Sequence, residues 1–353
     1  MSARNISHAR RRLLRWYDKN RRDLPWRQTA DPYAIWIAET MLQQTQVKTV
    51  LPYYERFMKT LPTVVALQRA TLRKVLALWS GLGYYRRAES LMRAAREIAR
   101  KHGGEIPASY DSLRSLPGIG DYTASALMSI AFGHPFPALD GNVRRVLHRF
   151  FGAATEIELR RAGRRFLSRA KPGDFNQALM ELGATICISR NPSCLRCPIA
   201  PDCVGRASLL RPPPLRKRRI PVRDIDWPLA LVCRDGKVLL RQRAAQGILP
   251  GLWELPGGER PRGESFIALL SRHLRELNGA VKPEYRIGAF RHSITNRRIS
   301  SSVFVFSVVP GATLRLPNRQ WRWFTPSALD RHPISAMTRK AISRLQAHDK
   351  SSS

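Results

Sequence analysis

Residues 113–133 read LRSLPGIGDYTASALMSIAFG and predict two helices joined by a tight turn. Gly118 and Gly120 fall where the backbone must turn sharply, because glycine adopts conformations that other residues avoid. Two missing side chains would also let successive backbone amides approach an anion closely. The second helix would begin directly afterwards, so the positive end of its dipole would face the same anion. The segment therefore predicts a phosphate site, although such turns also join many helix pairs that bind nothing.

The composition of the chain indicates a polyanionic partner. Of its 353 residues, 61 are Lys or Arg and 26 are Asp or Glu, so the formal net charge is +35. Such a charge favours nucleic acid as the partner, and a basic composition that only raises solubility is the alternative. The apolar fraction of 43% excludes a chain that is disordered throughout. No apolar run is long enough to span a membrane and no secretory signal begins the chain, so we expect a cytoplasmic protein.

The chain divides into two parts that differ in their pattern of apolar residues. Apolar residues recur at spacings of three and four over residues 1–206, which predicts an all-helical domain. A basic stretch with three consecutive prolines follows, and we expect a linker over residues 207–226. Residues 227–346 predict a smaller α/β domain, followed by a disordered tail at 347–353. Within that domain we expect a hairpin over 227–243 around Asp235-Gly236, a helix over 265–279 and a strand over 298–309.

Four of the five cysteines lie between residues 187 and 203. Such clustering without a signal peptide suggests a metal site rather than disulfides. Four thiolates suit either tetrahedral zinc or a [4Fe–4S] cluster, and spacing alone does not decide between them. The fifth cysteine, Cys233, stands in an apolar run and is expected in a core. The predicted ligands are Cys187, Cys194, Cys197 and Cys203.

One acidic residue stands in an apolar and amide-rich segment. Glu39 is surrounded by residues such as Ala38 and Met41. A carboxyl with such neighbours should have a raised pKa, which suits a general acid; a solvent-facing helical glutamate is the alternative. Three amides follow that could contact base edges or fill the space left by an extruded nucleotide, namely Gln43, Gln44 and Gln46.

A second candidate carboxylate, Asp140, comes just before a helix predicted to begin near Gly141 or Asn142. The simpler interpretation of this aspartate is a helix N-cap. The functional interpretation is an anion that stabilises an oxocarbenium-like sugar while a C–N bond breaks, as carboxylates do in glycoside hydrolysis. One residue can do both, because a cap leaves its second oxygen free.

Together these segments resemble the MutY-type adenine DNA glycosylases of the endonuclease III, helix-hairpin-helix superfamily. The resemblance rests on the cysteine spacing and on LPWR at 24–27, AETMLQQTQV at 38–47, GLGYY at 81–85, LPGIG at 116–120 and LDGNVRRVL at 139–147. It implies a [4Fe–4S] cluster rather than zinc. It also implies a monomeric bacterial enzyme of the nucleoid that acts in base excision repair. The substrate would be double-stranded DNA in which adenine is mispaired with 8-oxoguanine or guanine.

The same resemblance implies a role for each site residue. Glu39 would protonate the leaving adenine, Asp140 would stabilise the cationic sugar, and Asn142 would orient water or the aspartate. Tyr84 matches the aromatic that is wedged into the duplex, and a core aromatic is the alternative for it. The expected DNA contacts are Arg27, Gln43, Gln44, Gln46, Tyr84, Gly118, Gly120 and Thr295.

One position separates two types of reaction. Bifunctional members of the superfamily carry a lysine two residues after the second hairpin glycine, where its amine forms a Schiff base with the sugar. Here that residue is Tyr122, and a phenol cannot form an imine. We therefore expect a monofunctional enzyme with Tyr122 in the catalytic site; an ordinary packing residue is the alternative. An endonuclease III-like pyrimidine glycosylase with lyase activity and a silent DNA-binding protein remain as alternative functions.

The C-terminal domain overlays a Nudix box that lacks most of its metal ligands. Conserved box positions are matched by Gly258, Glu264, Arg272, Leu274, Glu276 and Gly279. The metal-binding acids belong at positions 273, 276 and 277, where this chain has His273, Glu276 and Leu277. One acid cannot hold Mg²⁺ well, which argues against a Nudix hydrolase. In the MutY family such a domain reads 8-oxoguanine through a Phe-Ser-His loop, and the matching residues here are Ile294, Thr295 and Asn296.

Overall fold

The protein, seen in a computed structural model, is described over residues 2–207, 221–243, 251–294 and 296–351. It divides into two compact units. The first unit is Met1–Ala70 with Glu89–Lys217, and the second is Thr71–Ala88 with Arg218–Ser353. Within the described ranges, no helix combines the length and the apolar character that crossing a membrane requires.

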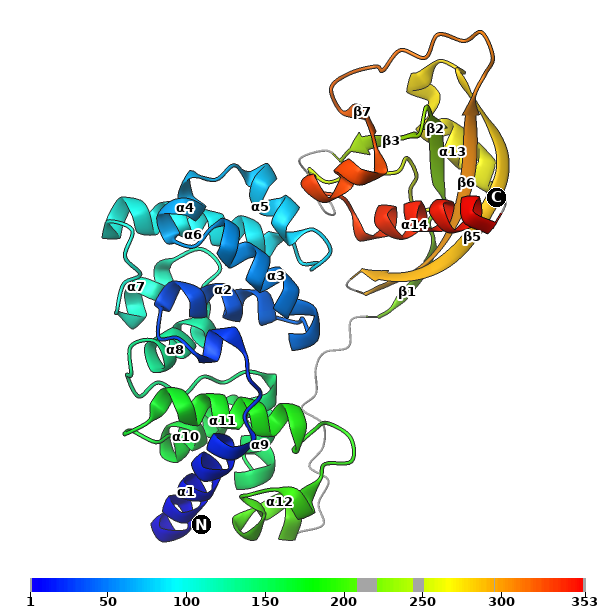
Figure 1. Cartoon of the computed structure of the whole chain (residues 1–353). Helices are drawn as coiled ribbons and strands as arrows, with labels where there is room; N and C mark the ends of the chain where they lie inside the picture. Colours follow the sequence, from blue (N-terminus) through cyan, green and yellow to red (C-terminus); the bar gives the residue numbers. More distant parts are fainter. Residues whose placement is uncertain (1, 208–220, 244–250, 295, 352–353) are drawn as a thin grey trace. The chain divides into compact units, whose positions relative to one another are not determined.

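The first unit is helical, as the apolar spacing predicted (Figure 1). Three short 3-10 turns interrupt it, at Pro25–Arg27, Cys194–Arg196 and Ala200–Asp202. Its helices are α1 (Ala3–Asn20), α2 (Pro32–Leu42), α3 (Val47–Thr60), α4 (Val64–Arg69), α6 (Arg86–His102, which begins in the second unit), α7 (Tyr110–Ser115), α8 (Asp121–Ile130), α9 (Gly141–Phe151), α10 (Glu156–Phe166), α11 (Pro172–Thr185) and α12 (Val204–Ala207).

A hydrophobic core joins α1, α9, α10 and α11. The buried residues of α1 are Ile6, Ala9, Leu13 and Tyr17, so one stripe of that helix faces inward. The Phe166 ring stacks on Phe150 with 4.8 Å between centroids and meets Phe175 edge-on at 5.0 Å. Such packing holds the helices that carry the site at fixed spacing.

The second unit contains a mixed sheet. Its strands follow the order β1-β6-β2-β3-β4, with β5 paired to β6 and β7 paired to β3. β6 runs parallel to β1 and to β2, and the remaining pairs are antiparallel. The strands are β1 (Arg223–Asp226), β2 (Leu229–Arg234), β3 (Lys237–Gln242), β4 (Trp253–Glu254), β5 (Val281–Ile294), β6 (Arg297–Val308) and β7 (Trp321–Phe324). The helices are α5 (Leu72–Trp79), α13 (Phe266–His273) and α14 (Ala336–Ser351), with 3-10 turns at Arg275–Leu277 and Pro326–Arg331.

Two of the expected elements of this unit are confirmed. β2 and β3 form the predicted hairpin, and Asp235 and Gly236 have φ of 50° and 66°. Positive φ at both turn residues matches the right-handed twist of the flanking strands. The strand predicted over 298–309 is β6.

Other expectations for this unit were incomplete. The helix expected over 265–279 ends at His273, and a 3-10 turn and a left-handed Asn278 finish the segment. β5 was not predicted, and it contains Ile294, which the resemblance had placed in a loop. β1 begins within the expected linker, and α14 extends to Ser351, into the expected disordered tail. β1 is mainly polar, so its structure comes from pairing with β6.

Candidate active site

The predicted turn is present as α7, the residues LPGIG and α8. Gly118 has φ of +80°, and a β-carbon there would lie 2.6 Å from the β-carbon of Ser90 on α6. Both facts require glycine at this position. Gly120 is the N-cap of α8, has an ordinary φ and has no neighbour in the way of a β-carbon. The hairpin is therefore fixed by Gly118, while Gly120 leaves open space at the start of α8.

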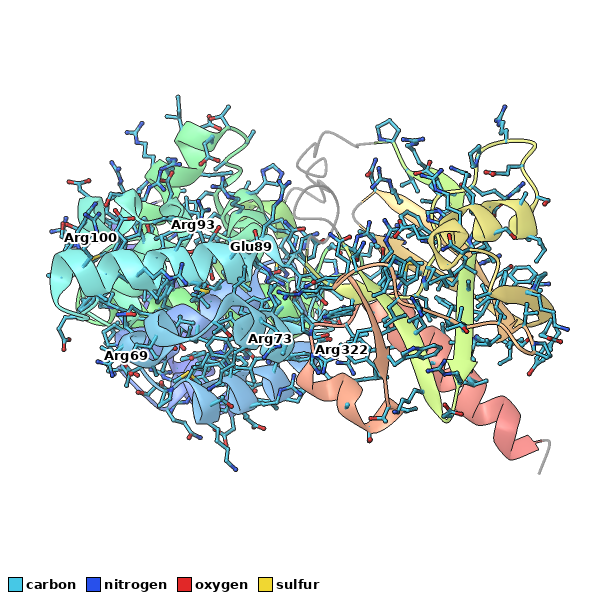
Figure 2. The ribbon with its side chains drawn as sticks, turned by 90° about the horizontal axis from the view of Figure 1, so that it is seen from above. Arg69, Arg73, Glu89, Arg93, Arg100 and Arg322 are labelled. Carbon is cyan, nitrogen blue, oxygen red and sulfur yellow. The ribbon has the colours of Figure 1, made fainter. Side chains whose placement is uncertain are left out.

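Basic side chains continue from this hairpin along α6. Arg93 donates a hydrogen bond of 3.3 Å to Oγ of Ser90, the residue that contacts the hairpin. Arg93 and Arg100 are exposed on α6, and Glu89 is one of only two acids on that helix (Figure 2). A row of positive charge beside a phosphate-sized turn suits the backbone of a nucleic acid.

Glu39 lies inside the first unit and not in solvent. It is on α2, which begins at the cap Asp31, and it is 5% exposed. Burial raises the pKa of Glu39 to about 7, although a hydrogen bond from Tyr122 opposes the rise. The alternative of a solvent-facing glutamate is wrong, because every residue from Tyr33 to Met41 is buried.

The phenol of Tyr122 donates a hydrogen bond to the carboxyl of Glu39. The distance from the phenol oxygen to Oε2 is 2.5 Å, and Sδ of Met180 on α11 lies 3.8 Å from the same phenol. Burial first, and then the charges of Glu39 and Asp140, raise the pKa of Tyr122 well above its usual value. The phenol therefore stays protonated and remains a donor. The position at which bifunctional relatives would place an amine is filled by a neutral hydroxyl.

Asp140 is the N-cap of α9, which was the simpler of its two interpretations. Its Oδ1 accepts the backbone N–H of Val143 at 2.6 Å, which starts α9 at Gly141. Its Oδ2 accepts a longer bond from Nδ2 of Asn142, at 3.3 Å. Burial raises the pKa of Asp140, and these hydrogen bonds act in the opposite direction. The charge of Asp140 also raises the pKa of Glu39, so the two carboxyls lie within electrostatic reach of each other.

An ion-pair cluster that sequence reasoning missed holds Arg27 beside Glu39. Glu181 on α11 has a fully buried side chain and accepts bonds from Arg22 at 2.7 and 2.8 Å and from Arg27 at 2.7 Å. The guanidinium of Arg27 also lies 5.5 Å from the centroid of the Tyr17 ring. The positive charge of Arg27 in turn lowers the pKa of Glu39. Glu181 carries no motif, but a glutamate in an apolar helical stretch is the same signal that pointed to Glu39.

The three candidate glutamines are in different environments. Gln43 donates a hydrogen bond of 3.3 Å to Oγ1 of Thr123 on α8, which ties it to the hairpin helix. Gln44 is exposed and has a positive φ of 59°. Gln46 is exposed and is the N-cap of α3. Gln44 and Gln46 are thus available at the surface, whereas Gln43 supports the site from within.

Tyr84 belongs to the second unit and is not a core aromatic. It is 41% exposed and has φ of 50°. The guanidinium of Arg87 lies 5.2 Å from its ring centroid and donates to the carbonyl of Gly83 at 3.1 Å. An exposed ring on a braced backbone in an unfavourable conformation is the geometry that a wedge residue needs.

Asn142 connects Asp140 to the start of the cysteine segment. Arg145 donates to Oδ1 of Asn142 at 2.8 Å, to the carbonyl of Gly183 at 2.6 Å and to that of Cys187 at 2.8 Å. A β-carbon at Gly183 would lie 2.6 Å from the β-carbon of Asn142. α9 and α11 therefore approach as closely as glycine allows, and Asn142 lies at the contact.

The four clustered cysteines influence one another. The charges of the other three help to raise the pKa of Cys197 to about 11, after burial as the main cause. Arg149 on α9 donates to Sγ of Cys187 at 3.3 Å, and the thiol of Cys203 donates to the Arg149 carbonyl at 3.4 Å. On α1, Arg12 donates to the carbonyl of Pro198 at 2.9 Å and pairs with Asp202. The loop is thus held from two helices.

The four clustered thiols form a donor set that suits either a metal ion or an iron–sulfur cluster. Among the described residues, no group of three or more His, Cys, Asp or Glu side chains is placed to hold one metal ion. Zinc would require four sulfur atoms at about 2.3 Å from one centre. In a [4Fe–4S] cluster each cysteine binds a different iron, so its four sulfur atoms lie farther apart.

The two acids of the Nudix-like box have partners within the second unit. Glu276 accepts the indole N–H of Trp321 at 3.0 Å and lies 3.8 Å from Arg241. Leu277 is buried in the core of the unit, and Glu264 is paired with Arg272 at 2.7 Å. The remaining acids thus have basic or N–H partners. Asn296 donates to the carbonyl of Pro221 at 3.0 Å, and Thr295 lies outside the described residues.

Comparison with known proteins gives the family. Residues 37–169 match the HhH-GPD superfamily base excision DNA repair protein family, and residues 229–344 match the NUDIX domain family. The adenine DNA glycosylase of Rattus norvegicus is 32% identical over 98% of this chain and 79% of its own. The chain belongs to the adenine DNA glycosylase family.

Further relatives of this adenine DNA glycosylase family member agree. The adenine DNA glycosylase of Schizosaccharomyces pombe is 38% identical over 92% of this chain and 86% of its own. A solved structure titled as a thermostable thymine-DNA glycosylase is similar with a TM-score of 0.55 and 29% identity, over 58% of this chain and 98% of that one. An endonuclease III–DNA complex, 21% identical with a TM-score of 0.52, shares the fold over 60% of this chain. The predicted helical glycosylase domain and Nudix-like domain are confirmed.

Proposed function

We propose that this protein is a monofunctional DNA glycosylase that removes adenine mispaired with 8-oxoguanine or guanine, in base excision repair. The observation that supports this best is the phenol of Tyr122 bonded to the buried Glu39, with Asp140 in electrostatic reach. An endonuclease III-like lyase needs an amine at that position to attack the sugar. The products would be free adenine and an abasic site.

The carboxyls of Glu39 and Asp140 would have different roles in the reaction. Glu39, with a pKa of about 7, would be protonated in a large fraction of molecules and would give its proton to the adenine ring as the glycosidic bond breaks. Asp140 would be ionised, and its Oδ2 would stabilise the positive charge that develops on the sugar. Asn142 would hold that oxygen, and water would complete the hydrolysis. Arg27 would line the base pocket and limit the rise in the pKa of Glu39.

Each unit would contribute its own contacts with DNA. The turn at Gly118 and Gly120 and the exposed arginines of α6 would contact phosphates, and Tyr84 would fill the gap in the base stack. Gln44 and Gln46 would contact the bases nearby. The Nudix-like domain would read the base opposite adenine through Ile294 and Thr295, because its remaining acids are already paired. Asn296, bonded to Pro221, would hold the chain rather than the base.

The cysteine loop would hold a [4Fe–4S] cluster through Cys187, Cys194, Cys197 and Cys203. When bound, the cluster supplies a rigid centre that closes the loop, and Arg149 would donate its hydrogen bond to a ligand sulfur. We further propose that the enzyme is a monomer that acts on the bacterial nucleoid. The helical domain would end near residue 206, and the chain between it and β1, which begins at Arg223, would link it to the reader.

One set of assays tests this function. Single-turnover excision is measured on duplexes with adenine opposite 8-oxoguanine, guanine, cytosine and thymine. Glu39→Gln should abolish base release and leave duplex binding intact, because the amide keeps the shape and has no acidic proton. Asp140→Asn should slow release by orders of magnitude. Near-normal excision by either variant would overturn the carboxyl assignments, and strand cleavage without added base would favour a lyase.

A second assay tests the reader. Thr295→Ala should reduce the preference for 8-oxoguanine over guanine by up to about tenfold, since one hydroxyl contact is worth about 0.5–1.5 kcal/mol. Ser343→Ala is the control, because its exposed hydroxyl bonds only to the nearby Lys340 carbonyl. An unchanged preference in Thr295→Ala would argue against the assignment of the opposite-base contact to this residue.

A further inference from the structure

The segment that leads into Asp140 has no helix or strand of its own. Residues 133–139 connect α8 to α9 in an extended, irregular path. Asn176, on α11, bonds to this segment in two places. Its Oδ1 accepts the N–H of Ala138 at 3.1 Å, and its Nδ2 donates to the carbonyl of Phe136 at 2.8 Å.

The two hydrogen bonds from Asn176 to this segment are those that a neighbouring parallel strand would make. The carbonyl of one residue and the N–H of the residue two positions later are the pair that a parallel strand would engage. The second N–H of Asn176 donates to Oγ of Ser129 on α8 at 2.8 Å. Asn176 is 1% exposed, so both donors and the acceptor are used inside the protein. An amide bonded on three sides has one orientation only.

The fixed backbone continues directly to the carboxylate. Ala138 is buried, and the carbonyl of Leu139 accepts a hydrogen bond from Arg144 on α9 at 3.1 Å. Asp140 itself is fastened to Val143 at its other side. The segment is therefore held by α11 through Asn176 and by α9 through Arg144 and Val143. Removal of Asn176 would release one of these two supports.

We propose that Asn176 is a positioning residue that sets where the carboxylate of Asp140 lies. The inference rests on the proposed role of Asp140 as the anion that stabilises the sugar cation. Without Asn176, the N–H of Ala138 and the carbonyl of Phe136 lose their partners in a buried region. The segment would shift to find new ones, and Asp140 would shift with it. A displacement of about 1 Å at a reacting group costs about 100-fold in rate.

A matched control separates positioning from stability. Ser129→Ala removes the hydroxyl that Asn176 contacts and keeps both bonds from Asn176 to the segment. Asn176→Ala removes those bonds as well. Single-turnover excision and binding to a duplex with an uncleavable adenine nucleotide are measured for the full-length variants, at a temperature where circular dichroism shows both folded. Each change is also made in the Asp140→Asn background.

Asn176→Ala should slow excision about 100-fold with binding within about twofold of wild type, and Ser129→Ala should change both by no more than about twofold. In the Asp140→Asn background, Asn176→Ala should slow the reaction little further, because residues that act as a unit are not additive. Full activity of Asn176→Ala, equal slowing by Ser129→Ala, or a full additional 100-fold loss in the double variant would overturn the proposal.

The same assays separate a failure of the proposed function from a failure of the Asn176 proposal. If wild type releases no adenine, the proposed function is wrong, and the inference falls with it. If wild type is active and Asp140→Asn is not, the function stands and only the Asn176 variants decide. Should Asn176→Ala fail to fold, Asn176→Asp replaces it, since it keeps the volume and the acceptor for Ala138 but lacks the donor to Phe136. Asn176→Asp must then slow excision about 100-fold, and it must slow the Asp140→Asn variant little further.

Discussion

Replacement of Tyr122 by phenylalanine should move one limb of the pH–rate profile. Glu39 acts when protonated, so excision should fall as the pH rises through its pKa of about 7. The Tyr122 hydrogen bond favours the ionised carboxylate and lowers that pKa. Tyr122→Phe removes the bond and should raise the pKa, so that the alkaline limb moves to higher pH.

The size of this movement follows from the hydrogen bond. A bond to a charged group is worth about 1.5–3 kcal/mol, and 1.36 kcal/mol corresponds to one pH unit, so the limb should move by about one to two pH units. The acid limb reports Asp140, which receives its hydrogen bonds from Val143 and Asn142. That limb should stay where it is.

Single-turnover excision across a pH series measures both limbs. Met180→Leu is the control, because Met180 contacts the phenol but has no bond to Glu39. An alkaline limb that stays in place or moves to lower pH in Tyr122→Phe would refute the assignment of that limb to Glu39. Equal movement in Met180→Leu would mean that packing, and not the hydrogen bond, sets the pKa.

Four further measurements test other parts of the structure. Purified protein should be brown and contain about four irons per chain, and stoichiometric zinc without iron would exclude the cluster. Gly118→Ala should weaken DNA binding and lower the melting temperature, because its β-carbon would meet Ser90 at 2.6 Å; an unchanged melting temperature would show that the hairpin can relax. Glu181→Gln should destabilise the protein by about 1–3 kcal/mol, since it removes the charge partner of the nearly buried Arg27, whereas Arg22 is 41% exposed. Because the pKa of Glu181 is lowered by its partners, this stability should be present above the usual glutamate range and lost in wild type as the pH falls through that lowered pKa. DNA affinity should fall with salt with a log–log slope of roughly −5 to −7 for ~5–8 phosphate contacts, and a slope near zero would contradict an electrostatic interface.

Much of the site could be predicted because its signals are local. A glutamate among apolar residues, an aspartate at a helix start and two glycines in a turn each indicate a property that holds without knowledge of the rest of the fold. The N-cap at Asp140 followed from such a pattern and is present. For Glu39 the pattern left burial and solvent exposure open, and the residue is buried. The phenol in place of an amine could also be read from one position, although its bond to Glu39 could not.

What could not be predicted depends on contacts between distant segments. Glu181 and Asn176 both lie on α11, and their partners are more than thirty residues away in the chain. β5 has a largely exposed, polar pattern and is a strand because β6 pairs with it over most of its length. Its residues Pro283 and Gly288, at register irregularities, would by themselves predict a break. Sequence periodicity describes one helix or strand at a time, whereas these contacts form between two elements that are distant in the chain.

The contacts of α11 also limit which insertions and deletions the protein can accept without loss of activity. Asn176, Met180 and Gly183 recur at intervals of four and three, so they form one stripe, and each serves a different part of the site: the segment before Asp140, the phenol of Tyr122, and the close approach of α9. One codon inserted between Asn176 and Met180 would turn every later residue by about 100° and advance it by about 1.5 Å. The first contact would then survive while the others point elsewhere. Insertions and deletions that preserve activity should therefore be confined to the connections on either side of α11, even though single substitutions at its exposed positions are tolerated.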